Sequence, residues 1–105
     1  MINALVQGKL HGDPLQRTAK NGKPFATVLV RVPLDNGDSM LVSAIAFDLA
    51  IVKGLMRLSE GDAVCLSGQF SPKVFMTTDN EPRPSADLVA HGLLTAYHVK
   101  RKRGK

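Results

Sequence analysis

The sequence has few of the residues that build disulfides, metal centres or membrane spans. Its 105 residues include no tryptophan, one tyrosine and one cysteine, Cys65. A single cysteine permits no internal disulfide and supplies too few thiolates for a structural zinc site, so we interpret Cys65 as a small buried residue. No apolar run approaches 18 residues and no secretory leader is evident, which predicts a soluble, cytoplasmic protein.

The chain also lacks the side-chain groupings that catalysis requires. His11, His91 and His98 have no metal-ligand spacing, and no nucleophile, base and orienting group occur together. No glycine-rich loop precedes a helix, and no carboxylate pair has an evident role. The sequence therefore predicts a protein that is not an enzyme and carries no metal or cofactor.

Positive charge is in excess, and it is unevenly distributed along the chain. The net charge is +5. Residues 1–34 hold one carboxylate, Asp13, against these cations: Lys9, Arg17, Lys20, Lys23 and Arg31. The segment 35–97 is acidic on balance, and the last residues are again basic. Such a distribution suits a polyanionic partner that meets one side of the molecule, and ordinary solvated surface cations account for it equally well.

Alternating apolar residues predict three strands in the first half of the chain. Apolar runs at 2–10 and 25–32 are joined across Gly-Asp-Pro and Asn-Gly breaks, and a turn at 35–38 leads to a third strand at 39–47. In the second strand, the even positions from 26 to 32 form the expected buried face. Arg31 stands on the opposite face, where a charge must meet solvent or a partner.

A short helix is expected after the third strand. Asp48 is its expected N-cap, and Gly61 is the expected stop signal beyond its end. The apolar positions at helical spacing are Leu49, Val52, Leu55 and Met56. These positions predict the side of the helix that packs on the core.

The rest of the chain predicts two further strands. The fourth spans 63–70 and resumes up to residue 77 after a bend or bulge at Pro72, which we expect on a sheet edge because proline cannot donate to a ladder. A loop at 79–84 leads to a fifth strand at 86–97, with a candidate bulge at Gly92.

Five strands with one helix between the third and the fourth have the element order of an OB-fold barrel. We therefore expect an all-β OB-fold domain over residues 1–97 and a disordered basic tail over residues 98–105. OB barrels bind oligonucleotides, sugars and proteins, so the fold alone does not determine the function.

Several stretches resemble the bacterial single-stranded DNA-binding proteins and the related primosomal replication-restart protein B. They are Gly-x-Leu-x-x-Asp-Pro-x-x-Arg at 8–17, Asn-Gly at 21–22, Ala-Ile-Ala-Phe at 44–47, and the run from Glu-Gly-Asp to Ser-Gly-Gln at 60–69. The resemblance implies a homodimer or homotetramer that holds single-stranded DNA without sequence preference in replication, recombination or repair.

The resemblance also implies which residues contact DNA. Phe47 and Phe75 match aromatic residues on which the family stacks bases. A third family aromatic falls on Leu41, and the loop that bears a fourth is shortened here to the 35–38 turn. The candidate phosphate contacts are Lys9, Arg17, Lys20, Lys23, Arg31 and Lys73.

The residues by themselves leave the roles of the aromatic side chains open. Phe47 fits a core or subunit-contact position as well as an exposed stacking platform, and we interpret Phe25 and Phe70 as core. Alternation sets Lys73 beside Phe75, and a cation next to an aromatic ring favours nucleic acid.

Two departures from the family pattern keep an alternative function open. The chain has no tryptophan, and residues 100–105 are basic where family members carry an acidic tail that recruits other replication proteins. The alternative is a replication or restart accessory that acts mainly as a protein-interaction module, docking through Leu41 and Ile45.

Overall fold

The computed structural model describes residues 2–35 and 37–95, apart from the side chains of Phe75 and Thr95. The predicted tail at 98–105 and the end of the predicted fifth strand lie outside the described residues. In chain order, the elements are β1 (Ile2–Leu10), β2 (Leu15–Thr18), β3 (Pro24–Pro33), β4 (Ser39–Ala46), α1 (Leu49–Leu55), β5 (Ala63–Met76) and β6 (Pro82–Thr95).

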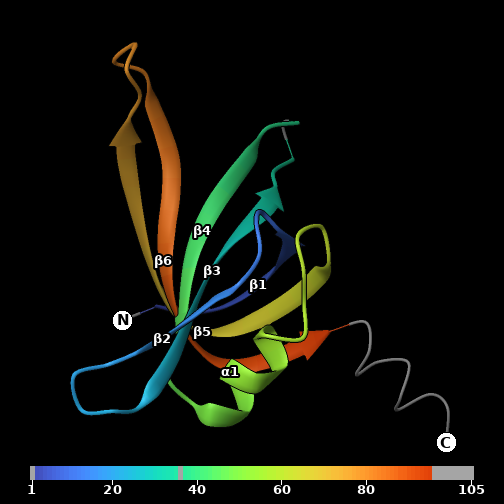
Figure 1. Cartoon of the computed structure of the whole chain (residues 1–105). Coiled ribbons are helices and arrows are strands. Elements are labelled where there is room, and N and C mark those ends of the chain that lie inside the picture. Colours follow the sequence, from blue (N-terminus) through green and yellow to red (C-terminus); the bar gives the residue numbers. More distant parts are fainter. Residues whose placement is uncertain (1, 36, 96–105) are drawn as a thin grey trace, which may run out of the picture.

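Five of these strands close into a barrel, as predicted (Figure 1). The strand order is β1-β5-β6-β4-β3, and a short pairing of β1 with β3 completes the ring. β4 and β6 run parallel, whereas the other pairs are antiparallel. With α1 between β4 and β5, this is the connectivity of an OB fold.

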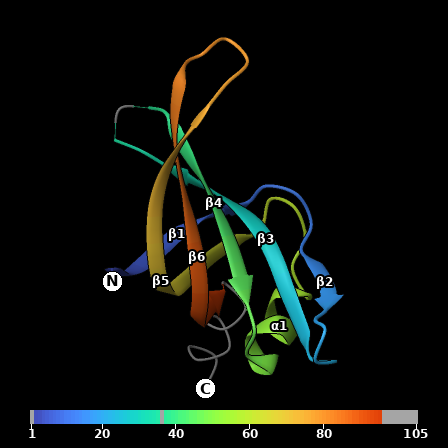
Figure 2. The same ribbon diagram turned by 90° about the vertical axis from the view of Figure 1, so that its left-hand side faces the viewer.

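The strand β2 was not predicted. It pairs only with β3 and extends the sheet beyond the ring (Figure 2). All four of its residues are exposed, and three of them are polar. A short, exposed strand has no alternation of buried and exposed positions, so the period of two that identifies strands is missing from its sequence.

The barrel closes where the backbones of β1 and β3 approach each other at Gly8. Lys9 and Leu10 pair with Arg31 and Val30, and a Cβ atom on Gly8 would overlap the carbonyl oxygen of Arg31. Only glycine permits this approach without moving a backbone, which explains the glycine that begins the 8–17 stretch.

Two loops that are distant in sequence meet beside this closure. The carboxylate of Asp13 accepts a hydrogen bond of 2.8 Å from the backbone N–H of Glu60. The N–H of Gly61 donates to the carbonyl oxygen of Leu10 over 3.0 Å. Two of the stretches that resemble the single-stranded DNA-binding proteins are therefore in contact with each other.

The core is built from small and branched side chains on the inward phase of the strands. Ala26, Val30, Val42 and Ala46 are completely buried, which confirms the predicted phases of β3 and β4. Phe70 packs against this core, as interpreted from the sequence.

The helix α1 covers one end of the barrel. The side of the helix that packs on the core differs from the predicted side. Its N-cap is Asp48 as expected, and the Asp48 carboxylate accepts a hydrogen bond from the Ala50 N–H. The helix ends at Leu55, well before Gly61. Its buried residues are Ile51, Val52 and Leu55, whereas Leu49 and Met56 are exposed. The two candidate faces share positions 52 and 55, so helical spacing could not separate them.

Beyond the barrel, β5 and β6 continue as a projecting two-stranded arm, seen at the top of Figure 1. β5 runs to Met76 without interruption, so the bend or bulge predicted at Pro72 is wrong. β1 pairs with β5 only as far as Phe70, and Pro72 therefore lies on an edge, as predicted, where no neighbouring strand requires a backbone N–H that proline lacks. β6 starts at Pro82, inside the predicted loop. The residues of the arm are in a strand because they pair with β5, and their composition does not indicate this pairing.

The irregularity of this ladder lies on β6, next to the predicted position. The register shifts between Ser67 and Gly68, and His91 is left without a partner beside Gly92. Within the described residues, no helix has the length and apolar character that crossing a membrane requires.

Replacing Gly8 with alanine should destabilise the barrel, because the new methyl group meets a backbone carbonyl group that cannot move without opening the closure. We expect a loss of about 2 kcal/mol or more in the free energy of unfolding, which corresponds to a melting temperature lower by roughly 10 °C. Thermal unfolding followed by circular dichroism measures this loss. The neighbouring Gln7→Ala, at an exposed position, is the control and should change stability by less than about 0.5 kcal/mol. Equal melting temperatures for the two variants would contradict the closure at Gly8.

Candidate nucleic-acid interface

The outward side chains of β2, β3 and β4 form one continuous surface, which we call the outer wall. It consists of the odd-numbered residues of 15–17, 25–31 and 41–47. Residues opposite one another across a ladder project to the same side. Leu15 therefore lies beside Thr27, and Thr27 beside Ile45. The row next to it holds Arg17 and Phe25 as direct partners.

Two aromatic rings meet on this wall. Phe47 directly follows β4 on its outward phase and is 58% exposed. Its ring centroid lies 6.0 Å from that of Phe25, with the ring planes inclined by 37°. The interpretation of Phe25 as core is wrong, since it is half-buried on the outward phase of β3 that also carries Arg31. In the sequence, Phe25 shares the odd-numbered positions of β3 with Arg31, and this alternation could have identified Phe25 as an outward residue.

The backbone on both sides of Phe47 is held firmly. Ala46 is completely buried in the core, and Asp48 caps the helix by accepting the Ala50 N–H over 2.9 Å. The end of β4 and the start of α1 thus fix the direction in which the Phe47 side chain leaves the main chain. The Phe47 ring is exposed in the single chain, which excludes the predicted alternative of a place in the core of that chain.

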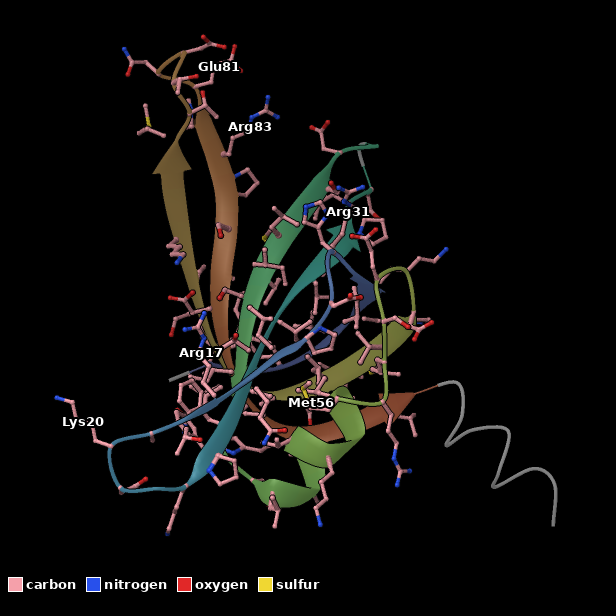
Figure 3. All side chains as sticks on the ribbon, in the orientation of Figure 1. Arg17, Lys20, Arg31, Met56, Glu81 and Arg83 are labelled. Carbon is pink, nitrogen blue, oxygen red and sulfur yellow. The ribbon has the colours of Figure 1, made fainter. Side chains whose placement is uncertain are left out.

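Unpaired cations gather at the same end of β3 as the two rings. Arg17 stands on β2, and Lys20 and Lys23 lie on the turn between β2 and β3, which closes through a 2.9 Å hydrogen bond from the Ala19 N–H to the Lys23 carbonyl oxygen. All three cations are exposed, and none forms an ion pair with a residue that the structure describes. Figure 3 shows Arg17 and Lys20 on this side of the molecule.

A second group of cations lies at the other end of β3. Lys9 and Arg31 are register partners at the barrel closure, and both are exposed. The guanidinium group of Arg31 donates from Nη2 to Nδ1 of His11 over 2.9 Å. His11 was not predicted to lie at the site, because its position beside Arg31 depends on the closure. Arg31 and Phe25 are separated by about 20 Å along β3, at about 3.3 Å per residue.

The chain is similar to known proteins in its three-dimensional structure. No protein-family model and no curated protein sequence matches the chain. A small single-stranded DNA-binding protein from Streptomyces coelicolor has a TM-score of 0.71 and 19% identity, over 90% of this chain and 93% of that chain. A mitochondrial single-stranded DNA-binding protein from S. cerevisiae has a TM-score of 0.68 and 14% identity, over 90% and 94% of the two chains. At these identities, the comparison establishes the fold, and it confirms the OB barrel.

The other two predicted contacts, Lys73 and Phe75, lie away from the rings. Both belong to β5, which β6 separates from β4. The ammonium group of Lys73 forms a 2.9 Å ion pair with Asp87. Phe75 pairs with Arg83 on the arm, and its side chain is outside the described part of the structure.

The middle of the outer wall is apolar. Leu15 is 53% exposed and Leu29 is 41% exposed, whereas Leu41 and Ile45 are half-buried. Sequence reasoning missed Leu15 and Leu29, because single exposed leucines carry no pattern. The wall thus combines exposed apolar and aromatic surface with unpaired cations at both ends, which suits a ligand that has flat apolar groups on an anionic backbone.

In the described part of the chain, no three His, Cys, Asp or Glu side chains are placed to hold a metal ion.

Proposed function

We propose that this protein binds single-stranded DNA on its outer wall, without sequence preference and without catalysing a reaction. Bases stack on Phe47, and phosphates contact the cations of the wall. The observation that carries the proposal is the exposed Phe47 ring beside unpaired cations on an OB barrel. Both similar structures described above are single-stranded DNA-binding proteins, which supports the proposal.

The chemistry of the wall favours an unpaired strand over a duplex. Base–aromatic stacking needs the face of a base, and a duplex covers those faces by stacking neighbouring base pairs. Stacking on protein aromatic side chains is tolerant of sequence, because every base has such a face. Cations that contact phosphates add affinity that is equally independent of sequence. We place this activity in DNA replication, recombination or repair, as the sequence resemblance implies, and we propose that it takes place in the cytoplasm.

The alternative function, a protein-docking module that acts through Leu41 and Ile45, has weaker support. Both side chains are half-buried between their neighbours on the sheet. The exposed apolar residues of the wall stand instead next to cations, at Leu15 and Leu29.

Fluorescence anisotropy with a labelled oligo-dT and a duplex of equal length tests the proposal at several salt concentrations. We expect tighter binding of oligo-dT. For the triple variant Arg17→Ala, Lys20→Ala, Lys23→Ala, the slope of log affinity against log salt should fall in magnitude by about 2, since each phosphate contact on a single strand contributes about 0.7.

The matched control for the triple variant removes exposed cations from another surface. Lys53→Ala with Arg57→Ala changes one exposed cation in the helix α1 and one just beyond its end, and should leave the salt slope nearly unchanged. Equal affinities for duplex and single strand would contradict the proposed preference for an unpaired strand. Equal slopes for the triple variant and the wild type would exclude binding through these three cations.

The ion pair of Lys73 with Asp87 leads to a second expectation. Asp87 lies on β6 beside Ser43 of the wall, so its carboxylate repels phosphates and also holds the Lys73 ammonium group. Asp87→Asn should therefore strengthen oligo-dT binding at low salt by about two- to fivefold, the range expected for one exposed charge interaction. Asp79→Asn, which removes the same charge at the tip of the arm, is the control. Weaker binding by Asp87→Asn would contradict this arrangement.

We also propose that the protein assembles as a homodimer or homotetramer through β1. β3 pairs only with Lys9 and Leu10, so the rest of β1 pairs on one side with β5 and has an open edge on the other. Residues 2–8 contain no charge and no proline, the features that normally protect an edge strand. Leu5 is 72% exposed on this strand.

Light scattering coupled to size-exclusion chromatography tests the assembly. The wild type should have a mass of two or four chains, and Leu5→Lys should shift it towards one chain, because it buries a charge in the proposed contact. Val74→Lys, at a position that is 67% exposed on the arm, is the matched control. A wild-type mass of one chain would refute assembly through β1.

A further inference from the structure

We infer that Phe25 and Phe47 act together as one composite platform for a single unpaired base, in which Phe25 is a positioning residue and Phe47 is the ring that the base contacts. This inference rests on the proposed function, and it adds a residue that the sequence analysis assigned to the core. It depends on three features of the pair: the ring geometry, the difference in exposure, and the elements that carry the two rings.

The ring geometry excludes a base between the two rings. A base inserted between two rings must stack on a face of each ring, so it needs parallel ring planes and two rings that do not contact each other. Here the centroids are 6.0 Å apart and the planes are inclined by 37°. The rings are already in contact with each other, since preferred aromatic pairs have centroids between about 4.5 and 7 Å apart. A base can therefore stack only on an outer face of the pair.

The difference in exposure assigns the two roles. Phe47 is 58% exposed, so its ring offers a free surface to a base. Phe25 is half-buried, with Phe47 on one side and its ladder partner Arg17 on the other. Its position leaves it less surface for a ligand than Phe47 has, and it supports the Phe47 ring from the side.

The elements that carry the rings explain why Phe47 needs this support. Phe25 stands on β3, where it pairs with Arg17 of β2 and directly precedes the first pair of β3 with β4, so the ladders hold its backbone. Phe47 follows the end of β4, beyond the last ladder pairs of that strand, and its ring contacts the ring of Phe25 on β3. Contact with Phe25 restricts the rotamers of Phe47 before the ligand arrives, which lowers the entropy cost of stacking.

The composite platform makes a specific prediction about coupling. Phe47→Leu should weaken oligo-dT binding about tenfold, which corresponds to one lost stacking contact. Phe25→Leu should weaken it about three- to fivefold. Because both changes disable the same platform, the double variant should bind nearly as Phe47→Leu does. Two independent contacts would instead give the product of the single effects, and that result would overturn the inference.

A fluorescent variant reports the contact between a base and the residue 47 ring independently of the binding affinity. The chain has no tryptophan, so Phe47→Trp introduces the single tryptophan at the contact position. Saturating oligo-dT should quench its emission strongly when residue 25 is Phe or Tyr, and clearly less with Phe25→Leu. Equal quenching at saturation in the Phe and Leu backgrounds would overturn the positioning role of Phe25.

Two controls separate this role from stability and from the proposed function. Phe70→Leu removes a ring that packs on the core, and it should lower the melting temperature without weakening oligo-dT binding relative to the wild type at a temperature where both are folded. If wild-type protein fails to bind oligo-dT at all, the proposed function is wrong. If it binds and Phe25→Leu has no effect on affinity or quenching, only the composite platform is wrong.

Discussion

The short pairing of β1 with β3 is the contact on which the rest of the structure depends. Only Lys9 and Leu10 take part in it, and it requires the close approach that Gly8 allows. Without this pairing, the five strands would form an open sheet whose inward side chains face solvent at both edges. With it, the inward phase becomes a closed core, and the outward phase of β3 becomes the centre of an exposed wall.

One strand therefore encodes both the core and the candidate site. The even positions of β3 from 26 to 30 are buried, and its odd positions carry Phe25, Leu29 and Arg31 outward. A shift of one residue in register would bury Arg31 and expose Val30, which opposes any alternative pairing. The ladder that specifies the fold consequently also sets the spacing of about 20 Å between the ring pair and the Arg31 end of the wall.

The features that could be predicted from the sequence are those that a local pattern encodes. Alternation identified the barrel strands, and the Asp48 cap and the 35–38 turn followed from residue chemistry. The features that were missed depend on contacts between distant segments. β2 has no alternation of its own, and the outward position of Phe25 became meaningful only through Phe47, which lies on another strand.

Dependence on distant contacts also explains why the strand was predicted to bend at Pro72 and why the sequence did not indicate that Asp87 pairs with Lys73. Proline chemistry correctly indicated an edge, but only the register with β6 reveals that the strand continues through it. Lys73 looked like a free cation in the sequence, and its carboxylate partner is fourteen residues away on the neighbouring strand. Local sequence patterns indicate which backbone conformation a residue prefers, whereas the pairing of charges depends on which strands are neighbours in the sheet.

The distribution of carboxylates explains how a barrel of balanced charge can present a basic wall. Asp13, Asp48 and Asp62 each accept a backbone N–H in a loop or at a helix start, where a carboxylate is structurally useful. The wall cations have no such backbone role, and they stand on strands and turns without carboxylate partners in the described structure. These three carboxylates are thus held where they stabilise a loop or the helix start, whereas the cations around the outer wall are left at the surface. In the proposed function, with few aromatic side chains to stack on, binding should depend on those cations, and therefore on salt, more than on base contacts.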